Sequence, residues 1–243
     1  MDHDPSSYGE SIAGIYDDLF GAMMDTDAAV ELLAELAGDG PALELGIGTG
    51  RLALPLWRRG IEVHGVDASP AMVEQLRRKP GGVEIPVTMG DLRNVPVDGR
   101  YGVVFLVFNT LFALTSQEDQ LRCFESVAGH LEPSGAFVVE CFVPDMTRWQ
   151  NHQTVQAQRI EEGRVMIEAS RHDPVNQRID SSLVVLGAEG TRLYPVRIRY
   201  AWPSELDLMA GAAGLRLRDR WGGWRREPFD SSSTKHVSVY VPA

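Results

Sequence analysis

The sequence predicts an α/β fold built on a doubly wound, largely parallel β-sheet, with an antiparallel β layer inserted near its C-terminal end. Three observations support this prediction. Short apolar segments alternate with amphipathic helical segments between residues 41 and 143, which is the order of βαβ units. A glycine-rich turn follows the first apolar segment, with Gly46, Gly48 and Gly50 at alternate positions. After Pro144 the helical period disappears, and alternating apolar and polar residues indicate strands instead.

The elements follow one another in a regular order. Residues 6–38 are predicted to form two helices with apolar stripes that include Ile12, Leu19 and Leu33. Seven strands are predicted near residues 41–45, 61–66, 83–89, 101–107, 135–143, 215–220 and 236–241. Helices are predicted near residues 50–59, 69–79, 117–131 and 203–214. Because crossovers between parallel strands are right-handed, these helices are expected to cover both faces of the sheet.

The segment between Pro144 and Trp202 predicts a separate layer. Turn signals at Glu162-Gly163, Asp173-Pro174 and Glu189-Gly190 separate runs in which apolar and polar residues alternate. Three or four antiparallel strands are therefore expected. One apolar face of this layer is expected to pack on the rest of the chain or on a second copy, as in a homodimer.

Composition argues against several functional classes. The 243-residue chain carries a net charge of −11 and its Lys and Arg residues are scattered, which argues against nucleic-acid binding. The longest apolar run in the sheet, Val103 to Phe108, is too short to span a bilayer, and no apolar signal-peptide core follows the polar N-terminus. Cys123 and Cys141 supply neither a disulfide framework nor a metal-ligand cluster. We therefore expect a cytoplasmic protein that does not bind membranes.

The end of the first strand carries the strongest functional signal. Dinucleotide-binding turns place their third glycine five residues after the first, where this chain has Arg51. Glu44 would repel a pyrophosphate but suits the cationic amino-acid moiety of S-adenosylmethionine (SAM). Asp67 lies 21 residues after Gly46 and ends the second strand, where an acid binds ribose hydroxyls. Together these features favour SAM over NAD.

Four motifs resemble those of the class I SAM-dependent methyltransferases. They are Glu44-x-Gly46-x-Gly48-x-Gly50, Val66-Asp67-Ala68-Ser69, Gly90-Asp91-Leu92 and the turn from Leu131 to Ala136. The resemblance implies a Rossmann-like sheet of seven strands whose last strand is antiparallel, with SAM as the cofactor. It implies that Glu44 and Gly46 hold the amino-acid end of SAM, that Asp67 binds its ribose, and that Asp91, Leu92 and Met72 contact its adenine. The implied cofactor-binding residues are Tyr8, Tyr16, Glu44, Gly46, Gly48, Asp67, Ala68, Met72, Asp91, Leu92 and Phe108.

A looser resemblance concerns the acceptor and the division of the chain. Asn109-Thr110-x-Phe112 and Trp224-x-x-Glu227-Pro228-Phe229 resemble small-molecule and peptide-amine methyltransferases of actinobacterial secondary metabolism, as in antibiotic biosynthesis. In many such enzymes the N-terminal helices fold over the cofactor. The implied units are an N-terminal helical lid (1–40), a SAM-binding core (41–145), the inserted substrate or dimer layer (146–200) and a C-terminal helix and strand pair that completes the core (201–243).

Catalytic candidates follow from the reaction of this family. Direct in-line methyl transfer needs orientation and no covalent enzyme intermediate. Asn109 is a candidate for orienting the acceptor, Glu140 for accepting a proton or anchoring an ammonium group, and Tyr16 for contacting SAM. Each has a structural alternative: a turn cap for Asn109, a pair with an arginine for Glu140, and packing for Tyr16. Because only Glu140 and Asp145 lie around the fifth strand, no metal is expected.

Substrate-binding candidates lie mainly outside the cofactor motifs. They are Asn109, Phe112, Arg171, Trp221 and His236. The alternatives are a core aromatic for Phe112, a solvent-facing side chain for Arg171, and structural roles for Trp221 and His236.

The sequence therefore predicts a SAM-dependent methyltransferase that acts on a nitrogen, or else an oxygen, of a small molecule in specialised metabolism. Nitrogen is favoured because an acidic cleft around Glu140 and Asp145 would attract a cationic amine. One alternative is a SAM-binding protein that catalyses a cyclisation or only binds. Another is an NAD-dependent oxidoreductase, which the glycine spacing disfavours.

Overall fold

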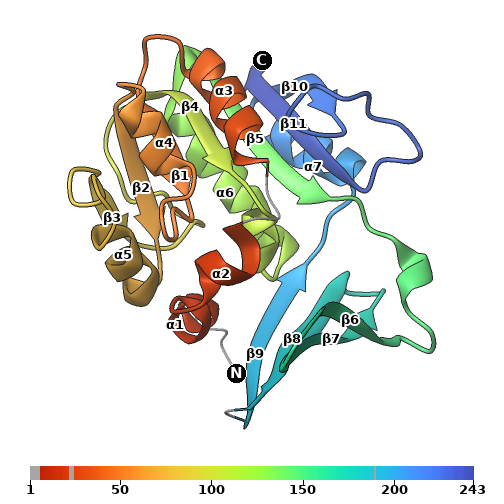
Figure 1. Cartoon of the computed structure of the whole chain (residues 1–243). Helices are drawn as coiled ribbons and strands as arrows, with labels where there is room; N and C mark the ends of the chain where they lie inside the picture. The colour runs from red at the N-terminus through yellow and green to blue at the C-terminus, as the bar shows by residue number, and fades with distance from the viewer. Residues whose placement is uncertain (1–5, 22–24, 189) are drawn as a thin grey trace.

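A central β-sheet forms the core of the computed structural model, which describes residues 6–21, 25–188 and 190–243. Its seven strands lie in the order β10-β11-β5-β4-β1-β2-β3. They are β1 (Ala42–Leu45), β2 (Val63–Asp67), β3 (Val87–Met89), β4 (Tyr101–Leu106), β5 (Leu131–Phe142), β10 (Leu215–Trp221) and β11 (Lys235–Pro242). Strands β1 to β5 are parallel to their neighbours among themselves, whereas β11 runs antiparallel to β5 and β10. The predicted Rossmann-like sheet with an antiparallel last strand is therefore confirmed (Figure 1).

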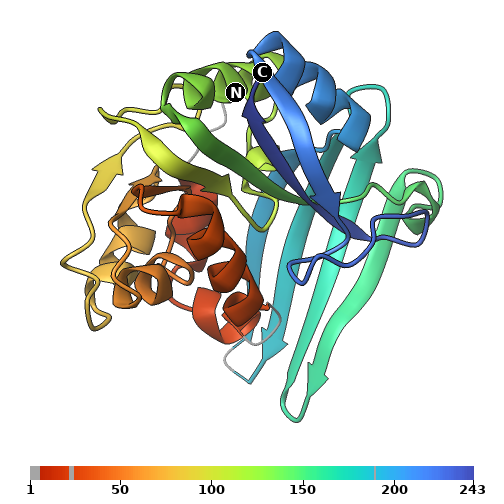
Figure 2. The ribbon, with the colours of Figure 1, turned by 90° about the horizontal axis from the view of Figure 1, so that it is seen from above.

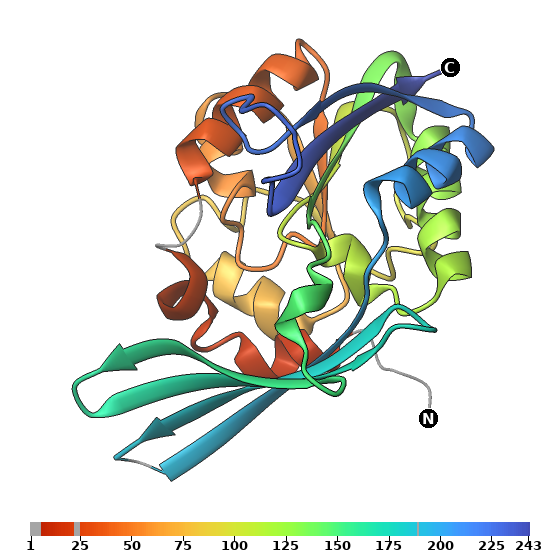
Figure 3. The ribbon, with the colours of Figure 1, turned by 90° about the vertical axis from the view of Figure 1, so that its right-hand side faces the viewer.

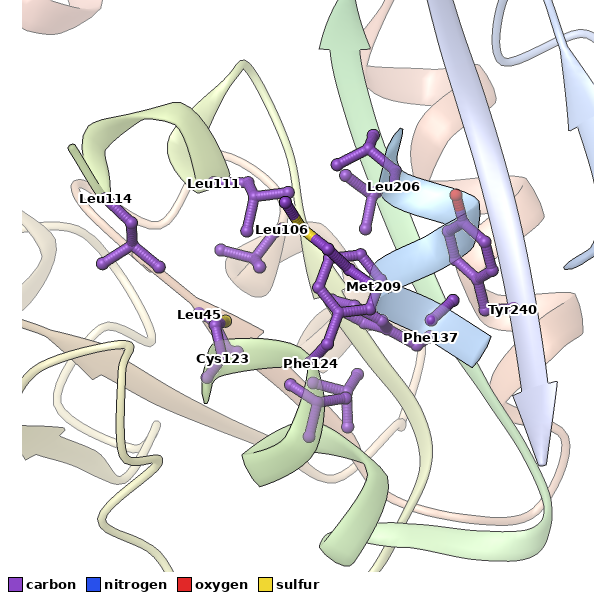
Figure 4. Close-up of a cluster of buried hydrophobic side chains, with 14 of the residues drawn as sticks. Leu45, Leu106, Leu111, Leu114, Cys123, Phe124, Phe137, Leu206, Met209 and Tyr240 are labelled. Carbon is purple, nitrogen blue, oxygen red and sulfur yellow. The ribbon is translucent and has the colours of Figure 1, made fainter. Parts of the chain in front are cut away.

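Helices cover both faces of this sheet and bury two apolar clusters. They are α3 (Thr26–Ala37), α4 (Ala53–Arg58), α5 (Pro70–Arg77), α6 (Gln117–Gly129) and α7 (Pro203–Ala212). On the face covered by α6 and α7, Phe124 packs against Phe137 and Tyr240 (Figure 4). On the face covered by α3 and α4, Leu33 and Leu56 are fully buried. Removing a buried aromatic ring from such a cluster costs about 3–5 kcal/mol, so these clusters hold the strands and their ends in place.

A second, antiparallel sheet lies apart from the first as a separate layer (Figures 2 and 3). Its four strands are β6 (Gln153–Glu161), β7 (Arg164–Asp173), β8 (Arg178–Gly187) and β9 (Gly190–Arg199). The helices α1 (Ser7–Ile12) and α2 (Tyr16–Phe20) lie between this sheet and the core (Figure 1). Ile12 and Leu19 of these helices pack with Met166 and Tyr194 of the sheet and with Met72 of α5. The apolar face predicted for the insert thus packs on helices of the same chain.

The N-terminal helices differ in number from the prediction. Two helices are expected over residues 6–38, but the structure has α1, α2 and α3 there. The backbone leaves the helical conformation at Ile15, where φ is −126°, so Ile12 and Leu19 belong to two short helices. Residues 1–5 and 22–24 of the expected lid lie outside the described residues.

The third strand is shorter than expected. The sequence predicts it over residues 83–89, but β3 begins at Val87. The guanidinium group of Arg77 donates hydrogen bonds to the carbonyl oxygens of Gly82 (2.6 Å) and Ile85 (2.8 Å), so the chain turns back toward α5 before the strand begins.

Across the described parts of the chain, no helix has the length and apolar character needed to cross a bilayer.

Candidate active site

A cavity of about 430 Å³ lies between the strand ends of the central sheet and the inner face of the second sheet. Both sheets and the helices α1 and α2 contribute to its walls. Eleven of the residues proposed from sequence line it: Tyr8, Tyr16, Gly46, Gly48, Asp67, Ala68, Met72, Asp91, Leu92, Phe108 and Asn109. The structure therefore brings most of the expected cofactor residues to one place.

The glycine turn after β1 has a backbone that only glycine adopts without strain. Gly46, Gly48 and Gly50 all have positive φ, at 75°, 55° and 79°. A Cβ atom on Gly46 would lie 2.6 Å from Cγ2 of Thr110, and one on Gly50 would lie 2.3 Å from Cδ1 of Leu76. At Gly46 and Gly50, both the positive φ and the collision with a neighbour exclude a side chain. The backbone of Gly46 and Gly48 therefore borders the cavity directly.

Glu44 is a buried carboxylate beside this turn, with an exposed fraction of 3%. Its Oε2 atom has no hydrogen-bond partner among the described residues. Burial raises the pKa of Glu44 from an ordinary value of 4.5 to about 8, although the positive charge of Arg51 opposes the shift. An unpartnered buried acceptor is costly, so this oxygen is suited to a donor that a ligand supplies, such as an ammonium group. Glu44 itself is not part of the cavity wall.

Two further acids lie at the ends of β2 and β3. Asp67 accepts hydrogen bonds from the backbone N–H groups of Gly48 (2.7 Å) and Ser69 (2.8 Å). Burial raises the pKa of Asp67, and these N–H groups limit the rise. Asp91 follows β3 and pairs with Arg93 at 2.5 Å. Burial acts to raise the pKa of Asp91, but the hydrogen bonds from Arg93 outweigh it and leave the value lowered.

Tyr8 and Tyr16 bring hydroxyl groups to the cavity from α1 and α2. Burial raises the pKa of both phenols, to about 12 for Tyr16. Both hydroxyls therefore stay protonated at neutral pH, which makes them hydrogen-bond donors and excludes them as bases.

Two carboxylates fasten these helices to the cofactor side of the cavity. Glu10 accepts hydrogen bonds from Oγ of Ser69 (2.8 Å) and from the backbone N–H of Ala71 (2.9 Å). Asp17 accepts one from Oγ1 of Thr49 (2.6 Å) and pairs with Lys79 at 2.6 Å. The helices α1 and α2 thus close one side of the cavity.

The turn after β4 contains two consecutive residues with left-handed backbone. Phe108 and Asn109 have φ values of 53° and 65°. Such a conformation costs roughly 1–3 kcal/mol in a residue other than glycine and persists only where neighbours impose it. Oδ1 of Asn109 accepts a hydrogen bond of 2.7 Å from the backbone N–H of Phe142, so the side chain caps the turn while it also borders the cavity.

Glu140 does not line the main cavity. Its carboxylate accepts hydrogen bonds from the backbone N–H of Phe108 (3.0 Å), from Nε1 of Trp224 (2.8 Å) and from Nζ of Lys235 (3.3 Å). It borders a second cavity of about 210 Å³ together with Arg51 and Lys235. Glu140 therefore binds the backbone of the β4 turn near the site. Its side-chain partners are a lysine and an indole, and not the arginine that was the structural alternative in the sequence analysis.

The remaining substrate candidates also lie away from the main cavity. Phe112 is fully buried in the core, edge-on to Phe142 at 5.1 Å between ring centroids. Arg171 is largely exposed and pairs with Asp180. Trp221 packs against the core, with Arg226 over its ring. His236 is fully buried, with Nδ1 2.8 Å from Oγ of Ser238, and burial lowers its pKa to about 4.

Sequence reasoning expects the inserted sheet to form a substrate or dimer layer, but it does not identify the residues of that sheet that line the cavity. These residues are Gln158, Arg159, Met166, Glu168, Ser181, Leu183, Tyr194, Val196 and Ile198. The alternation along each strand shows which of them share a face, but not which face turns inward. Among the described residues, no group of three or more His, Cys, Asp or Glu side chains is placed to hold a metal ion.

Comparison with known proteins gives consistent matches over the whole chain. A family model described as a methyltransferase domain matches residues 42–135. The solved structure of the CcbJ methyltransferase from Streptomyces caelestis has a TM-score of 0.94 and 42% identity, and the match covers 99% of this chain and 100% of that one. The cypemycin N-terminal methyltransferase of a Streptomyces species is 28% identical over 97% of this chain and 98% of its own length. A SAM-bound amino pentose methyltransferase from Micromonospora echinaspora shares the fold, with a TM-score of 0.70 and 22% identity over 94% of this chain and 97% of that one.

Proposed function

This chain belongs to the class I SAM-dependent methyltransferases, and from that premise we propose that it transfers the methyl group of SAM to an amine nitrogen of a small molecule in specialised metabolism. The observation that carries the proposal is one cavity of about 430 Å³ that joins cofactor-type strand ends to a wall of apolar and polar side chains from the second sheet. Nitrogen is favoured over oxygen because the cypemycin relative is an N-terminal methyltransferase by name.

The residues of the first half of the cavity fit SAM. Asp67 is placed at the strand end where ribose hydroxyls bind. Glu44 lies outside the cavity wall, next to the glycine turn, and its unpartnered Oε2 is suited to the ammonium group of SAM. Met72 lines the cavity between these acids and α1, where it would pack on adenine. When bound, SAM supplies an electrophilic methyl carbon on its sulfonium centre.

The second half of the cavity would hold the acceptor. Leu183, Tyr194 and Val196 form an apolar wall, in which Glu168 places a carboxylate. Its Oε2 accepts a hydrogen bond of 2.7 Å from Gln158 and lies 3.5 Å from Nη2 of Arg148, which leaves Oε1 for a group of the acceptor. Glu168 is therefore suited to anchor an ammonium or hydroxyl group of the acceptor, away from the reacting nitrogen, while the apolar wall excludes water from its body.

Catalysis in this proposal rests on orientation, without a metal or a covalent intermediate. Holding reactants in the correct geometry is worth roughly 7–11 kcal/mol of barrier. Because Oδ1 of Asn109 is bound to Phe142, its Nδ2 group is the part of the side chain that is left to donate a hydrogen bond to the acceptor. The hydroxyls of Tyr8 and Tyr16 donate hydrogen bonds at the cofactor end. A neutral amine attacks without a base, and the methylated product loses its proton to water afterwards.

Methyl-labelled SAM and a panel of acceptors test this function. The panel pairs each amine with the phenol or alcohol of the same carbon skeleton, so that only the nucleophilic atom differs. We expect the labelled methyl group in the amines, and little of it in the phenols and alcohols that match them. Mass spectrometry identifies the position of the new methyl group. Label only in oxygen partners would overturn the choice of nitrogen. Calorimetric binding of SAM without transfer to any acceptor would favour the non-methylating alternative.

A further inference from the structure

The left-handed turn at Phe108 and Asn109 stands between the two cavities. Both residues border the main cavity and also the second cavity of about 210 Å³. Phe108 also contacts the lid, since its ring lies 5.3 Å from that of Phe20 in α2. A shift of this turn would therefore move the wall of the methyl-transfer cavity and its contact with the lid together.

Glu140 holds this turn from the side of the second cavity. Its Oε2 accepts the backbone N–H of Phe108, and its own backbone carbonyl accepts the N–H of Asn109 at 3.1 Å. One residue of β5 thus binds two successive N–H groups of the turn. Phe108 needs such support most, because a phenylalanine rarely adopts φ above zero, whereas an asparagine adopts it more readily.

Glu140 is itself held by a distant segment. The indole N–H of Trp224, which is 5% exposed, donates to Oε1 of Glu140 across 84 positions of sequence. The loop that carries Trp224 is tied to the N-terminal helices: Arg225 pairs with Asp25, and Arg226 pairs with Glu35. Glu140 therefore links the C-terminal loop to the β4 turn, and Arg225 and Arg226 link the same loop to α3 and to the residue before it.

We propose that Glu140 and Trp224 are positioning residues, which hold Phe108 and Asn109 in the left-handed turn that shapes the methyl-transfer cavity. The effect on catalysis rests on the proposed function, whereas the effect on the turn does not. Both oxygens of Glu140 already accept hydrogen bonds, and the carboxylate is not part of the main cavity wall, so it acts through the turn and not on the acceptor.

Amide hydrogen exchange of the full chain tests the effect on the turn without any substrate. We expect Glu140→Ala to speed exchange in the peptide that contains residues 106–112 by about 10-fold or more, because a buried N–H loses its acceptor. Glu140→Gln keeps one acceptor oxygen and is expected to speed it less. Oε1 of Glu140 accepts from both Trp224 and Lys235, so adding Trp224→Phe to Glu140→Gln removes one of two donors that would face the new amide group. This double variant is expected to exchange more slowly than Glu140→Gln, part of the way back toward the wild-type rate. Unchanged exchange in Glu140→Ala would overturn the proposal.

Methyl transfer to an amine from the labelled-SAM panel tests the effect on catalysis. We expect Glu140→Ala to lower kcat/KM by about 100-fold, since a misplacement of about 1 Å has that effect. Glu140→Gln is expected to keep most of the activity that Glu140→Ala loses. The shape of its pH–rate profile is expected to match that of the wild type. If Glu140 were instead a base, Glu140→Gln would be as inactive as Glu140→Ala and the acidic limb of the profile would disappear.

Matched controls separate this role from general stability. Glu132→Gln is the control for Glu140, because it changes a carboxylate at the other end of β5. Trp57→Phe is the control for Trp224, because both indoles pack in the same apolar cluster. Both substitutions are expected to leave exchange in residues 106–112 and kcat/KM within about 2-fold of wild type. Calorimetry with S-adenosylhomocysteine shows whether each variant still binds the cofactor product. If no acceptor is methylated by the wild-type protein, the proposed function fails while the exchange experiment still decides this inference.

Discussion

The two halves of the main cavity are built on different physical principles. The cofactor half consists mainly of strand ends of the central sheet, with the glycine turn and acids such as Asp67 and Asp91, and α1 and α2 close it. The acceptor half consists of side chains on one face of the second sheet, which include apolar residues such as Leu183 and the charged residues Arg159 and Glu168. Backbone conformation and charge determine the first half, whereas side-chain size and shape determine the second. A change in the first half should thus affect SAM binding, and a change in the second should affect only the acceptor.

The largest effect is expected at the glycine turn. Gly46→Ala places a side chain at φ 75° and within 2.6 Å of Thr110, so both strain and collision oppose it. We expect the affinity for SAM, measured by calorimetry, to fall by about 100-fold or more, which is about 2.7 kcal/mol or more.

Gly60→Ala is the matched control for this change. Gly60 has φ 85°, but an added Cβ would meet nothing within 4 Å, and the residue is outside the cavity. The control therefore carries the strain alone and is expected to lower the melting temperature while leaving SAM affinity within about 2-fold. An equal loss of SAM affinity in both variants would show that strain, and not the shape of the cofactor half, accounts for the result.

A smaller effect with a distinct pH dependence is expected at Glu44. Its folded-state pKa of about 8 lies above the ordinary 4.5, so the folded protein binds the proton more tightly than the unfolded chain. The free energy of unfolding of the SAM-free protein should therefore fall as pH rises from about 4.5 to about 8. Glu44→Gln removes this dependence, and thermal melts at pH 5.5 to 8.5, chosen to lie roughly across this window, should show a flatter profile for the variant.

The same substitution should weaken SAM binding. An ionised Glu44 paired with an ammonium group is a charge-assisted hydrogen bond, so SAM affinity should rise with pH up to about 8 in wild type and stay flat in Glu44→Gln. At pH of about 8.5 we expect about a 10-fold weaker affinity for the variant. A variant that binds SAM as tightly as wild type at that pH would contradict the proposed contact between Glu44 and the ammonium group of SAM.

The smallest effect is expected in the acceptor half. It is the most direct test of whether the two halves of the cavity bind different molecules. Glu168→Gln keeps the size of the side chain and removes its charge. We expect KM for the amine acceptor to rise by about 5–10-fold, with the dissociation constant of SAM unchanged. The reason is that a partly exposed ion pair contributes about 1 kcal/mol. Arg171→Gln, on the same strand but outside the cavity, serves as the control for loss of a charge from β7. Weaker SAM binding in Glu168→Gln would break the division into two halves.

The fold and the cofactor half follow from residues that are close together in sequence. Alternation of apolar segments predicts the central sheet, and a turn such as Gly46 to Gly50 has its conformation written in adjacent positions, because only glycine adopts it without strain. Asp67 and Asp91 are predictable for a related reason: parallel strands all present their C-terminal ends at the same edge of a sheet. The length of β3 and the number of helices before residue 38 differ from the prediction, where side chains bind the backbone or a helix breaks.

The acceptor half and the roles of Glu140, Trp221 and His236 depend on contacts between residues far apart in the chain. The sequence places Glu140 at the end of a strand but does not show that Trp224, 84 positions later, binds its carboxylate and turns it into a support for the β4 turn. In the second sheet, alternation distinguishes two faces without stating which one covers the cavity. Packing of the whole chain selects that face, because burial depends on what lies opposite each side chain and not on its neighbours in sequence.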